Sequence, residues 1–321
     1  MKLVVLDGYT LNPGDLSWKP LECFGELVIF DRTKPEELLS RIKGASAIFT
    51  NKVIIDDSVI RHSPTLKYIG VMATGYNVVD LQAANRAGIT VTNIPAYSTN
   101  SVAQLVFSFI LHFANQLHRH AADVADGGWT NSPDFSYTLS PQQELAGKVI
   151  GIVGFGQIGQ KVAQIAQAFG MRVIFQNRSD KSHLNHDWQQ VELDDLLTQA
   201  DYVSLNCPLT AENHGFMNLE KLLRMKKGAV LINTARGALV DEQALAEVLN
   251  TGRLAGAGLD VLTHEPPEAN NPLPTTRNCI ITPHIAWATQ SARKRLLHIL
   301  TSNFEAYLNH KPQNVVNHPF Y

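Results

Sequence analysis

Two patterns of apolar residues alternate along the chain. Short apolar runs rich in β-branched residues are typical of buried strands, and apolar residues repeating every three or four positions are typical of helices. The runs predict strands at residues 3–6, 27–30, 47–50, 66–72, 89–91, 148–153, 172–176, 201–205, 229–233 and 280–284. The repeats predict helices at residues 35–42, 98–122, 158–169, 191–197, 219–225, 240–249 and 289–308. Strands that alternate with helices in this way favour an α/β fold with doubly wound parallel sheets.

The longest of the internal predicted helices, residues 98–122, has an apolar stripe too wide for one buried face. The stripe consists of Val102, Leu105, Val106, Phe109, Ile110 and Phe113. We interpret this helix as a hinge that joins two domains and packs a homodimer; a helix wholly inside one domain is the alternative. The irregular segment 127–145 follows, and it contains Trp129, Pro133, Phe135 and Tyr137. We expect this segment to cover the substrate site or to embrace a partner subunit.

Three glycines follow the predicted strand 148–153 and open the next helix, in the order Gly154-Phe-Gly156-Gln-Ile-Gly159. Gly154 permits a tight turn, Gly156 lets a pyrophosphate approach the backbone, and Gly159 lets helix and strand pack closely. The free N–H groups of the helix N-terminus also attract phosphate. Because strand and helix flank the glycines, we interpret them as a dinucleotide-binding turn; a purely structural turn is the alternative.

The end of the next strand departs from the usual dinucleotide-binding pattern. A carboxylate is expected there to bind the ribose hydroxyls, but the chain has Asn177, Arg178 and Ser179, with no carboxylate before Asp180. Arg178 with its two neighbours is suited to a 2′-phosphate through charge-assisted hydrogen bonds. We therefore predict NADP(H) in preference to NAD(H). The alternative is a solvated Arg178 in a protein that accepts both cofactors.

Polar residues also stand at the ends of the strands in the first hundred residues. Asp7, Asn51 and the pair Thr74-Gly75 each follow a predicted strand. Ligands of open parallel sheets bind at the carboxyl ends of the strands. Thr74 and Gly75 can therefore present backbone N–H groups to an anionic substrate, unless they form only a turn.

Composition narrows the class of protein. The chain has 321 residues, enough for two domains, and 45% of them are apolar. A formal net charge of −2 gives no support for binding to nucleic acid or to a membrane. Cys23, Cys207 and Cys279 lack the spacing of a disulfide framework or a zinc site, so we expect no metal. With only a short apolar run at residues 3–6, we expect a protein of the reducing cytoplasm.

Three polar residues in the second half suit hydride transfer to a 2-oxo acid. Arg236 can bind the substrate carboxylate bidentately and polarise the neighbouring ketone. His284 can supply the proton that the resulting alkoxide needs. Glu265, hydrogen-bonded to the far ring nitrogen, would orient His284 and favour its protonated form. Taken singly, such residues are most often surface groups, and the chain has 12 histidines.

Five segments occur together in this chain: the glycine turn, Phe169-Gly-Met171, Asn233-Thr-Ala-Arg-Gly237, Asp260-Val-Leu-Thr-His-Glu265-Pro266 and Pro283-His284. In this combination the chain resembles the D-isomer-specific 2-hydroxyacid dehydrogenase family, and the resemblance covers nearly its whole length. It implies a flavodoxin-like substrate domain built from residues 1–98 and 287–321. A Rossmann-type cofactor domain, residues 99–286, is then inserted between these two parts, and two subunits pair through the hinge helix.

The resemblance also implies a role for each matching residue. Arg236 would bind the substrate, Glu265 would partner the histidine, and His284 would donate the proton. The implied cofactor contacts are Gln157, Ile158, Asn177, Arg178, Cys207, Pro208, Asn213, Thr234, Ala235 and Asp260.

Within the family, Pro283-His-Ile-Ala-Trp-Ala288 looks like the glycerate dehydrogenase and hydroxypyruvate reductase branch. Trp287 would narrow the pocket in favour of hydroxypyruvate or glyoxylate; packing between domains is its other reading. We therefore expect an enzyme that reduces small 2-oxo acids to D-2-hydroxy acids. The alternatives are a D-2-hydroxyacid dehydrogenase for another 2-oxo acid, and a cofactor-sensing protein similar to transcriptional corepressors.

Overall fold

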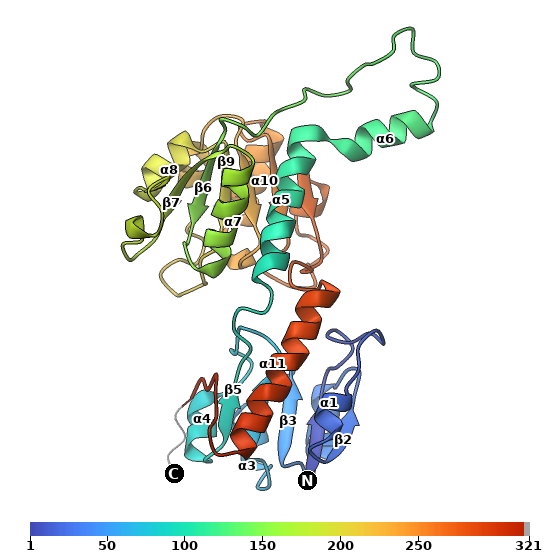
Figure 1. The fold of residues 1–321 in the computed structure, drawn as a ribbon, viewed down its shortest axis with the longest axis vertical. Coiled ribbons are helices and arrows are strands. Elements are labelled where there is room, and N and C mark those ends of the chain that lie inside the picture. The colour runs from blue at the N-terminus through green and yellow to red at the C-terminus, as the bar shows by residue number, and fades with distance from the viewer. Residues whose placement is uncertain (318–321) are drawn as a thin grey trace. The chain divides into compact units, whose positions relative to one another are not determined.

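A computed structural model describes residues 1–317 and divides the chain into two compact units (Figure 1). The first contains Met1–Ser98 and the segment that begins at Trp287, and the second is Thr99–Ala286. Each unit has a single sheet in which all neighbouring strands are parallel, with helices beside it. The predicted α/β class with two parallel sheets is therefore confirmed.

The sheet of the first unit has five strands in the order β2-β1-β3-β4-β5. Their bounds are β1 Lys2–Val5, β2 Glu26–Ile29, β3 Ala47–Thr50, β4 Tyr68–Val71 and β5 Thr90–Thr92. This is the flavodoxin-like order, in which the order of the strands along the sheet reverses between β1 and β3. The helices are α1 Lys19–Glu22, α2 Leu38–Ile42, α3 Asp57–Arg61, α4 Leu81–Arg86 and α11 Gln290–Leu308.

Helix α11 comes from the other end of the chain and packs on this sheet. Its buried Leu296, Leu300 and Phe304 share one hydrophobic cluster with Phe49 of β3 and Tyr68 of β4. The predicted helix was placed correctly, and Thr289 caps its N-terminus by accepting a hydrogen bond from the N–H of Ala292. The two distant segments of the chain therefore form one core.

The sheet of the second unit has seven strands in the order β12-β11-β10-β9-β6-β7-β8. Their bounds are β6 Val149–Val153, β7 Arg172–Gln176, β8 Trp188–Gln190, β9 Tyr202–Leu205, β10 Val230–Asn233, β11 Gly256–Leu259 and β12 Cys279–Ile281. The order is that of a dinucleotide-binding fold with one added edge strand, and β6 lies at the point where the order reverses. The glycine turn that follows β6 therefore lies at the sheet edge where such folds bind ligands.

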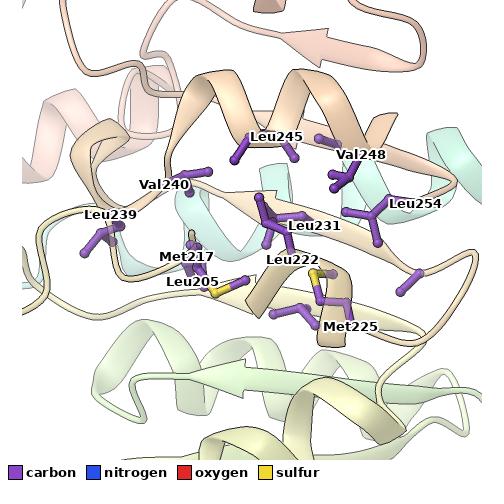
Figure 2. Packing of buried hydrophobic residues seen from close by; sticks show 14 of the residues in the cluster. Leu205, Met217, Leu222, Met225, Leu231, Leu239, Val240, Leu245, Val248 and Leu254 are labelled. Atoms are coloured by element: carbon purple, nitrogen blue, oxygen red, sulfur yellow. The ribbon is translucent and has the colours of Figure 1, made fainter. Parts of the chain in front are cut away.

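Helices cover both faces of this second sheet. Helices α5 Thr99–Asn115 and α7 Gln157–Ala168 pack side by side on one face (Figure 1). On the other face, α8 Leu193–Gln199, α9 Leu219–Arg224 and α10 Glu242–Asn250 enclose a separate core. In Figure 2, Leu245 and Val248 of α10 point toward Leu231 of β10. Burial on both faces explains why these strands read as unbroken apolar runs.

The prediction of one helix over residues 98–122 is wrong. Gln116 adopts a left-handed conformation with φ 45° and ends α5, and a second helix, α6, spans Leu117–Ala125. None of the residues of α6 is buried, and the helix projects from the rest of its unit together with the irregular segment 127–145 (Figure 1). The apolar repeat continues across the break, so periodicity alone did not reveal it.

Further elements differ from the predictions: strand β11 and helices α1, α3 and α4 were not among the predicted elements. Strand β8 was not predicted, because it is three residues long and only Trp188 in it is buried. The last predicted strand, 280–284, ends at Ile281, and His284 takes a left-handed conformation with φ 53°. No helix within residues 1–317 combines the length and the apolar character needed to cross a membrane.

Candidate active site

The glycine turn after β6 has little room for side chains at two of its three glycines. Gly154 has φ 91°, and a Cβ there would lie 2.6 Å from the backbone nitrogen of Cys207. A Cβ on Gly159 would lie 2.3 Å from the carbonyl oxygen of Gly154. A Cβ on Gly156 would meet no atom within 4 Å. Gly154 and Gly159 are therefore required by packing, whereas Gly156 faces open space where a phosphate group fits.

Helix α7 begins at this open position. Its N-cap is Gly156, which has no side chain to cap the first N–H groups, and Gln157 and Ile158 form the first turn. Uncapped N–H groups and the positive end of the helix dipole attract an anion. The turn therefore has the room and the free N–H groups that a phosphate needs, and the pyrophosphate contact stays a prediction.

Asn177 connects the end of β7 to the glycine turn. Its Oδ1 accepts the N–H of Phe155 at 3.1 Å, and its Nδ2 donates to both the carbonyl and the hydroxyl oxygen of Ser179 at 3.0 Å. Gln190 of β8 donates to the carbonyl oxygens of Asn177 and Ser179. The loop that carries Arg178 is thus held from both sides, while Arg178 itself is exposed.

The charge of Arg178 reaches the loop that follows β9. Burial raises the pKa of the Cys207 thiol, and the Arg178 guanidinium acts against this rise. The pKa of Glu212 is lowered, chiefly by a hydrogen bond from Thr210 and least by the Arg178 charge. The side chain of Asn213 ties the same loop together by donating to the Pro208 carbonyl and accepting the N–H of Thr210. Arg178 therefore provides a positive charge beside the predicted contacts Cys207, Pro208 and Asn213.

The turn after β10 is organised by a buried asparagine. Asn233 accepts the N–H of Ala235 at 3.0 Å and donates to the carbonyl oxygen of Arg236 at 2.8 Å. The Oγ1 atom of Thr234 is buried and has no hydrogen-bond partner in the part of the chain that the structure describes. The Arg236 side chain is exposed, and its Nη1 donates to the Ala235 carbonyl at 2.7 Å. Sequence reasoning did not identify Asn233 as the residue that shapes this turn.

The turn of Arg236 packs directly on the loop that carries Glu265. A Cβ on Gly237 would lie 1.9 Å from the carbonyl carbon of Leu262, so only glycine permits this approach. Glu265 accepts the N–H of Leu262 at 3.1 Å through Oε1. Its Oε2 lies 2.6 Å from Nδ1 of His284. The structure thus brings Glu265 and His284 into contact, with both side chains about one third exposed at 35% and 32%.

Asp260 holds the loop that carries His284. Its buried carboxylate accepts hydrogen bonds from the Thr282 hydroxyl at 2.6 Å and from the N–H groups of Ile285 at 2.8 Å and Ala286 at 2.7 Å. Burial raises the pKa of the Asp260 carboxyl, although these hydrogen bonds act in the opposite direction. The predicted contact of Asp260 with the cofactor stays a prediction, whereas its bonds to residues 282–286 are part of the fold.

The polar strand ends of the first unit are organised by another buried carboxylate. Asp7 accepts the N–H groups of Asn51 at 2.8 Å, Lys52 at 2.6 Å and Val53 at 3.3 Å. Burial raises the pKa of the Asp7 carboxyl, and the backbone hydrogen bonds counteract the rise. Asp7 therefore fixes the loop on which Asn51 lies.

Thr74 is also fixed through its own polar groups. Its hydroxyl donates to the Ile94 carbonyl at 2.8 Å, and its carbonyl accepts from the Asn93 side chain at 2.7 Å. Within residues 1–317, the backbone N–H groups of Thr74 and Gly75 make no hydrogen bond. Trp287 packs edge-on against Tyr97, with ring centroids 6.5 Å apart. The backbone N–H groups of Thr74 and Gly75 are therefore available to bind an anion.

The residues of the second unit fit a dinucleotide cofactor on three observations: the open space at Gly156, the uncapped start of α7 and the buried Oγ1 of Thr234 without a partner. In residues 1–317 no three His, Cys, Asp or Glu side chains are close enough together to hold a metal ion.

Comparison with known proteins identifies the family. Residues 107–286 match the model of the D-isomer specific 2-hydroxyacid dehydrogenase NAD-binding domain. A hydroxypyruvate reductase of Blautia hydrogenotrophica is 46% identical over 99% of this chain and 100% of its own length. The chain belongs to this family. The resemblance stated from the sequence motifs is thereby confirmed, and so is the prediction of an NAD(P)-dependent D-2-hydroxyacid dehydrogenase.

Two further relatives of this D-2-hydroxyacid dehydrogenase extend the comparison. A glycerate dehydrogenase of Methylorubrum extorquens is 40% identical over 88% of both chains. The solved structure of an acyclic imino acid reductase in complex with NADPH and D-Arg matches with a TM-score of 0.85 at 33% identity, covering 98% of this chain and 100% of its own. The chain is therefore an enzyme and not the cofactor-sensing binding protein considered as an alternative. Its reaction is the NAD(P)-dependent reduction of a 2-oxo acid.

Proposed function

We propose that this dehydrogenase reduces hydroxypyruvate and glyoxylate to the corresponding 2-hydroxy acids, in the D configuration where the product is chiral, with His284 as the general acid. The observation that carries the proposal is the 2.6 Å contact between His284 Nδ1 and Glu265, on a loop packed against the turn of Arg236. The names of the hydroxypyruvate reductase and glycerate dehydrogenase relatives support this choice of substrate.

The chemistry divides between the cofactor and the chain. A bound reduced nicotinamide supplies the hydride that adds to the carbonyl carbon of the 2-oxo acid. Arg236 binds the substrate carboxylate through two parallel hydrogen bonds and stabilises the negative charge that develops on the ketone oxygen. Because Arg236 is exposed and bonded only to its neighbouring carbonyl among the contacts described above, its guanidinium can reorient toward an anion.

His284 completes the reaction by giving a proton to that oxygen. Its Nδ1 is engaged by Glu265, so Nε2 is the ring atom that donates. The carboxylate stabilises the imidazolium before the transfer and holds the ring in one orientation afterwards. Asp260 holds the backbone around His284, whose left-handed φ of 53° needs such support.

Residues of the first unit add to the substrate contacts of Arg236 and His284, and the cofactor contacts are assigned to the second unit. The free N–H groups of Thr74 and Gly75 bind the substrate carboxylate, Asn51 hydrogen-bonds a substrate oxygen, and Trp287 limits the size of the 2-oxo acid. The cofactor would be held by the glycine turn, Asn177 to Ser179, the Cys207–Asn213 loop and Thr234-Ala235.

We assign NADP(H) as the preferred cofactor because Arg178 is exposed on a braced loop that has no carboxylate to repel a 2′-phosphate. The kcat/KM for NADPH should exceed that for NADH, and Arg178→Ala should remove most of the difference while leaving kcat with NADH unchanged. A clear preference of the unaltered enzyme for NADH would contradict the assignment.

A homodimer accounts for the apolar side chains that α6 and the segment after it expose. Leu117, Val124, Trp129 and Phe135 are between 46% and 91% exposed. The segment is not loose, because Tyr137 hydrogen-bonds Asp123 and Trp129 donates to the Phe135 carbonyl. Large apolar side chains on an ordered projection mark a protein interface. Light scattering should give twice the mass of one chain, and removal of Leu117 and Phe135 side chains should shift it toward the monomer.

A substrate panel tests the reaction itself. Hydroxypyruvate, glyoxylate, pyruvate and a larger 2-oxo acid are each supplied with NADPH and with NADH, and cofactor oxidation is followed. The proposal expects the highest kcat/KM for hydroxypyruvate or glyoxylate. Arg236→Lys should raise KM for the acid, because an ammonium cannot reproduce the bidentate fork. A best substrate with a bulky side chain would contradict the proposed substrate class.

A further inference from the structure

We infer that Glu242, acting through Asn271, positions the catalytic Glu265–His284 pair. Glu242 is the first residue of α10 and touches neither His284 nor Glu265 in any hydrogen bond described above. Its role is to hold the loop between β11 and β12 in the conformation that presents Glu265. The catalytic consequence rests on the function proposed above, whereas the conformational consequence can be measured without it.

The loop that carries Glu265 has little apolar anchorage. Leu262 is 7% exposed and Leu273 is 0% exposed, and both pack in the core below α10. Between them, residues 263–270 are all exposed. A surface segment of this length keeps one conformation only if polar contacts fix it at several points, because ordering each residue costs about 1–2 kcal/mol.

Glu242 supplies two of these contacts from outside the loop. Its Oε1 accepts the N–H of Thr263 at 2.6 Å, and its Oε2 accepts from Nδ2 of Asn271 at 2.6 Å. Asn271 in turn accepts the N–H of Leu273 at 2.9 Å through Oδ1. One carboxylate thus clamps both ends of the exposed stretch to the start of α10, with short, charge-assisted hydrogen bonds.

The clamp lies next to the groups that fix Glu265. The residue before Thr263 is Leu262, whose N–H is donated to Oε1 of Glu265 at 3.1 Å. The same Leu262 packs against Gly237, the neighbour of Arg236. A displacement of Thr263 would therefore move both the Glu265 carboxylate and the surface that supports the Arg236 turn.

The helix itself does not depend on Glu242. Asp241 caps α10 by accepting the N–H groups of Gln243 and Ala244, and Ala244, Leu245, Val248 and Leu249 are buried below it. Replacing Glu242 should therefore leave the helix and the sheet in place and loosen mainly the loop. Variants at residue 242 can therefore distinguish a role in positioning the loop from a general contribution to folding.

Because Asn271 donates to Glu242, the carboxylate and the amide can be exchanged between the two residues without changing the net charge. In Glu242→Gln, the introduced amide nitrogen faces the amide nitrogen of Asn271, and two donors meet. In Asn271→Asp, two carboxylates meet at the same place and repel each other. In the double variant, the introduced glutamine donates to the introduced aspartate, which still accepts the N–H of Leu273. The glutamine oxygen still accepts the N–H of Thr263, so every bond is restored.

The test compares Glu242→Ala, Glu242→Gln, Asn271→Asp and the double variant with Gln243→Ala, an exposed neighbour, as control. Steady-state rates with hydroxypyruvate and NADPH are measured for each variant, and NADPH affinity is measured by fluorescence. We expect kcat of Glu242→Ala to fall between about tenfold and a hundredfold, because a displacement of about 1 Å in a catalytic group can cost about 10²-fold, with unchanged NADPH affinity.

Recovery of kcat in the double variant shows whether the contact between residues 242 and 271 is what positions the loop. The double variant should return to within a few-fold of the unaltered kcat, although each single change lowers it. Glu242→Ala with an unaltered kcat would overturn the inference. So would a loss that only follows the fraction of unfolded protein, with no recovery in the double variant.

Amide exchange keeps this test separate from the proposed reaction. If the unaltered protein turned over none of the 2-oxo acids, the proposed function would fail, but the clamp would still be measurable. Exchange of residues 262–271 should accelerate in Glu242→Ala and return in the double variant. Equal exchange in all variants would overturn the clamp whatever the substrate is.

Discussion

Replacing Asp260 with asparagine tests how the loop of His284 is held. The carboxylate accepts three hydrogen bonds, from the Thr282 hydroxyl and the N–H groups of Ile285 and Ala286. Asparagine has nearly the same shape but only one acceptor oxygen. If its oxygen keeps the bonds of Thr282 and Ile285, its NH₂ group faces the N–H of Ala286, and a buried donor loses its partner.

The size of the effect follows from this geometry. A hydrogen bond to a charged acceptor contributes about 1.5–3 kcal/mol, and a buried donor without a partner costs about 1–3 kcal/mol. The amide escapes the desolvation that raises the pKa of the Asp260 carboxyl, which offsets part of the loss. We therefore expect the free energy of unfolding to fall by about 2–4 kcal/mol.

Turnover should respond more strongly than stability. His284 lies between Thr282 and Ile285 and has φ 53°, so a loosened loop leaves it free to relax toward the right-handed region. A displacement of about 1 Å at a proton donor can cost about 10²-fold in rate, and we expect kcat to fall by about this factor.

Urea unfolding and steady-state kinetics measure the two effects on the same samples. Thr282→Val is the matched control, since it removes one of the three bonds without changing the shape, and roughly half of the stability loss is expected. Asp260→Asn with unaltered unfolding free energy and unaltered kcat would refute the assignment of Asp260 as the support of this loop.

Further predictions concern the acid stability of the first unit and the glycine turn. The Arg293 guanidinium lowers the pKa of Asp15 to about 2, so its stabilising contribution is complete above the unfolded value of 3.8 and is lost as pH falls toward 2. Asp15→Asn should flatten that acid limb in urea unfolding between pH 2 and 6; an unchanged slope would contradict the ion pair. Gly159→Ala should destabilise the protein by about 1–3 kcal/mol, because the new methyl group overlaps the Gly154 carbonyl. Gly156→Ala should stay within about 0.5 kcal/mol of the unaltered stability but weaken NADPH binding, and the opposite pattern in calorimetry would contradict the roles of the two glycines.

The parallel strands were the part of the fold that the sequence predicted best. Ala47–Thr50 and Arg172–Gln176 were predicted end to end, because strands buried on both faces are continuous apolar runs bounded by polar residues. The break at Gln116 was missed, since a single left-handed residue leaves the apolar repeat of its neighbours unchanged. Strand β8 was missed because an edge strand of three residues carries almost no pattern.

The candidate site was predictable where a motif carried it. The contact between Glu265 and His284, nineteen residues apart, could be expected from the family resemblance. The supporting roles of Asp7 and Glu242 were not recognised, because a side chain that accepts backbone N–H groups from another loop leaves no periodic trace. Such residues become visible only when the loops are seen together.

The central claim is that His284, backed by Glu265, donates a proton during reduction of a small 2-oxo acid. Single-turnover rates with saturating NADPH and hydroxypyruvate compare His284→Ala with His298→Ala, a matched change at an exposed histidine on α11. We expect the single-turnover rate to fall by about 10²–10⁴-fold in His284→Ala with unaltered NADPH affinity, and not to fall in His298→Ala. A His284→Ala enzyme that reduces hydroxypyruvate at the unaltered rate would contradict this claim.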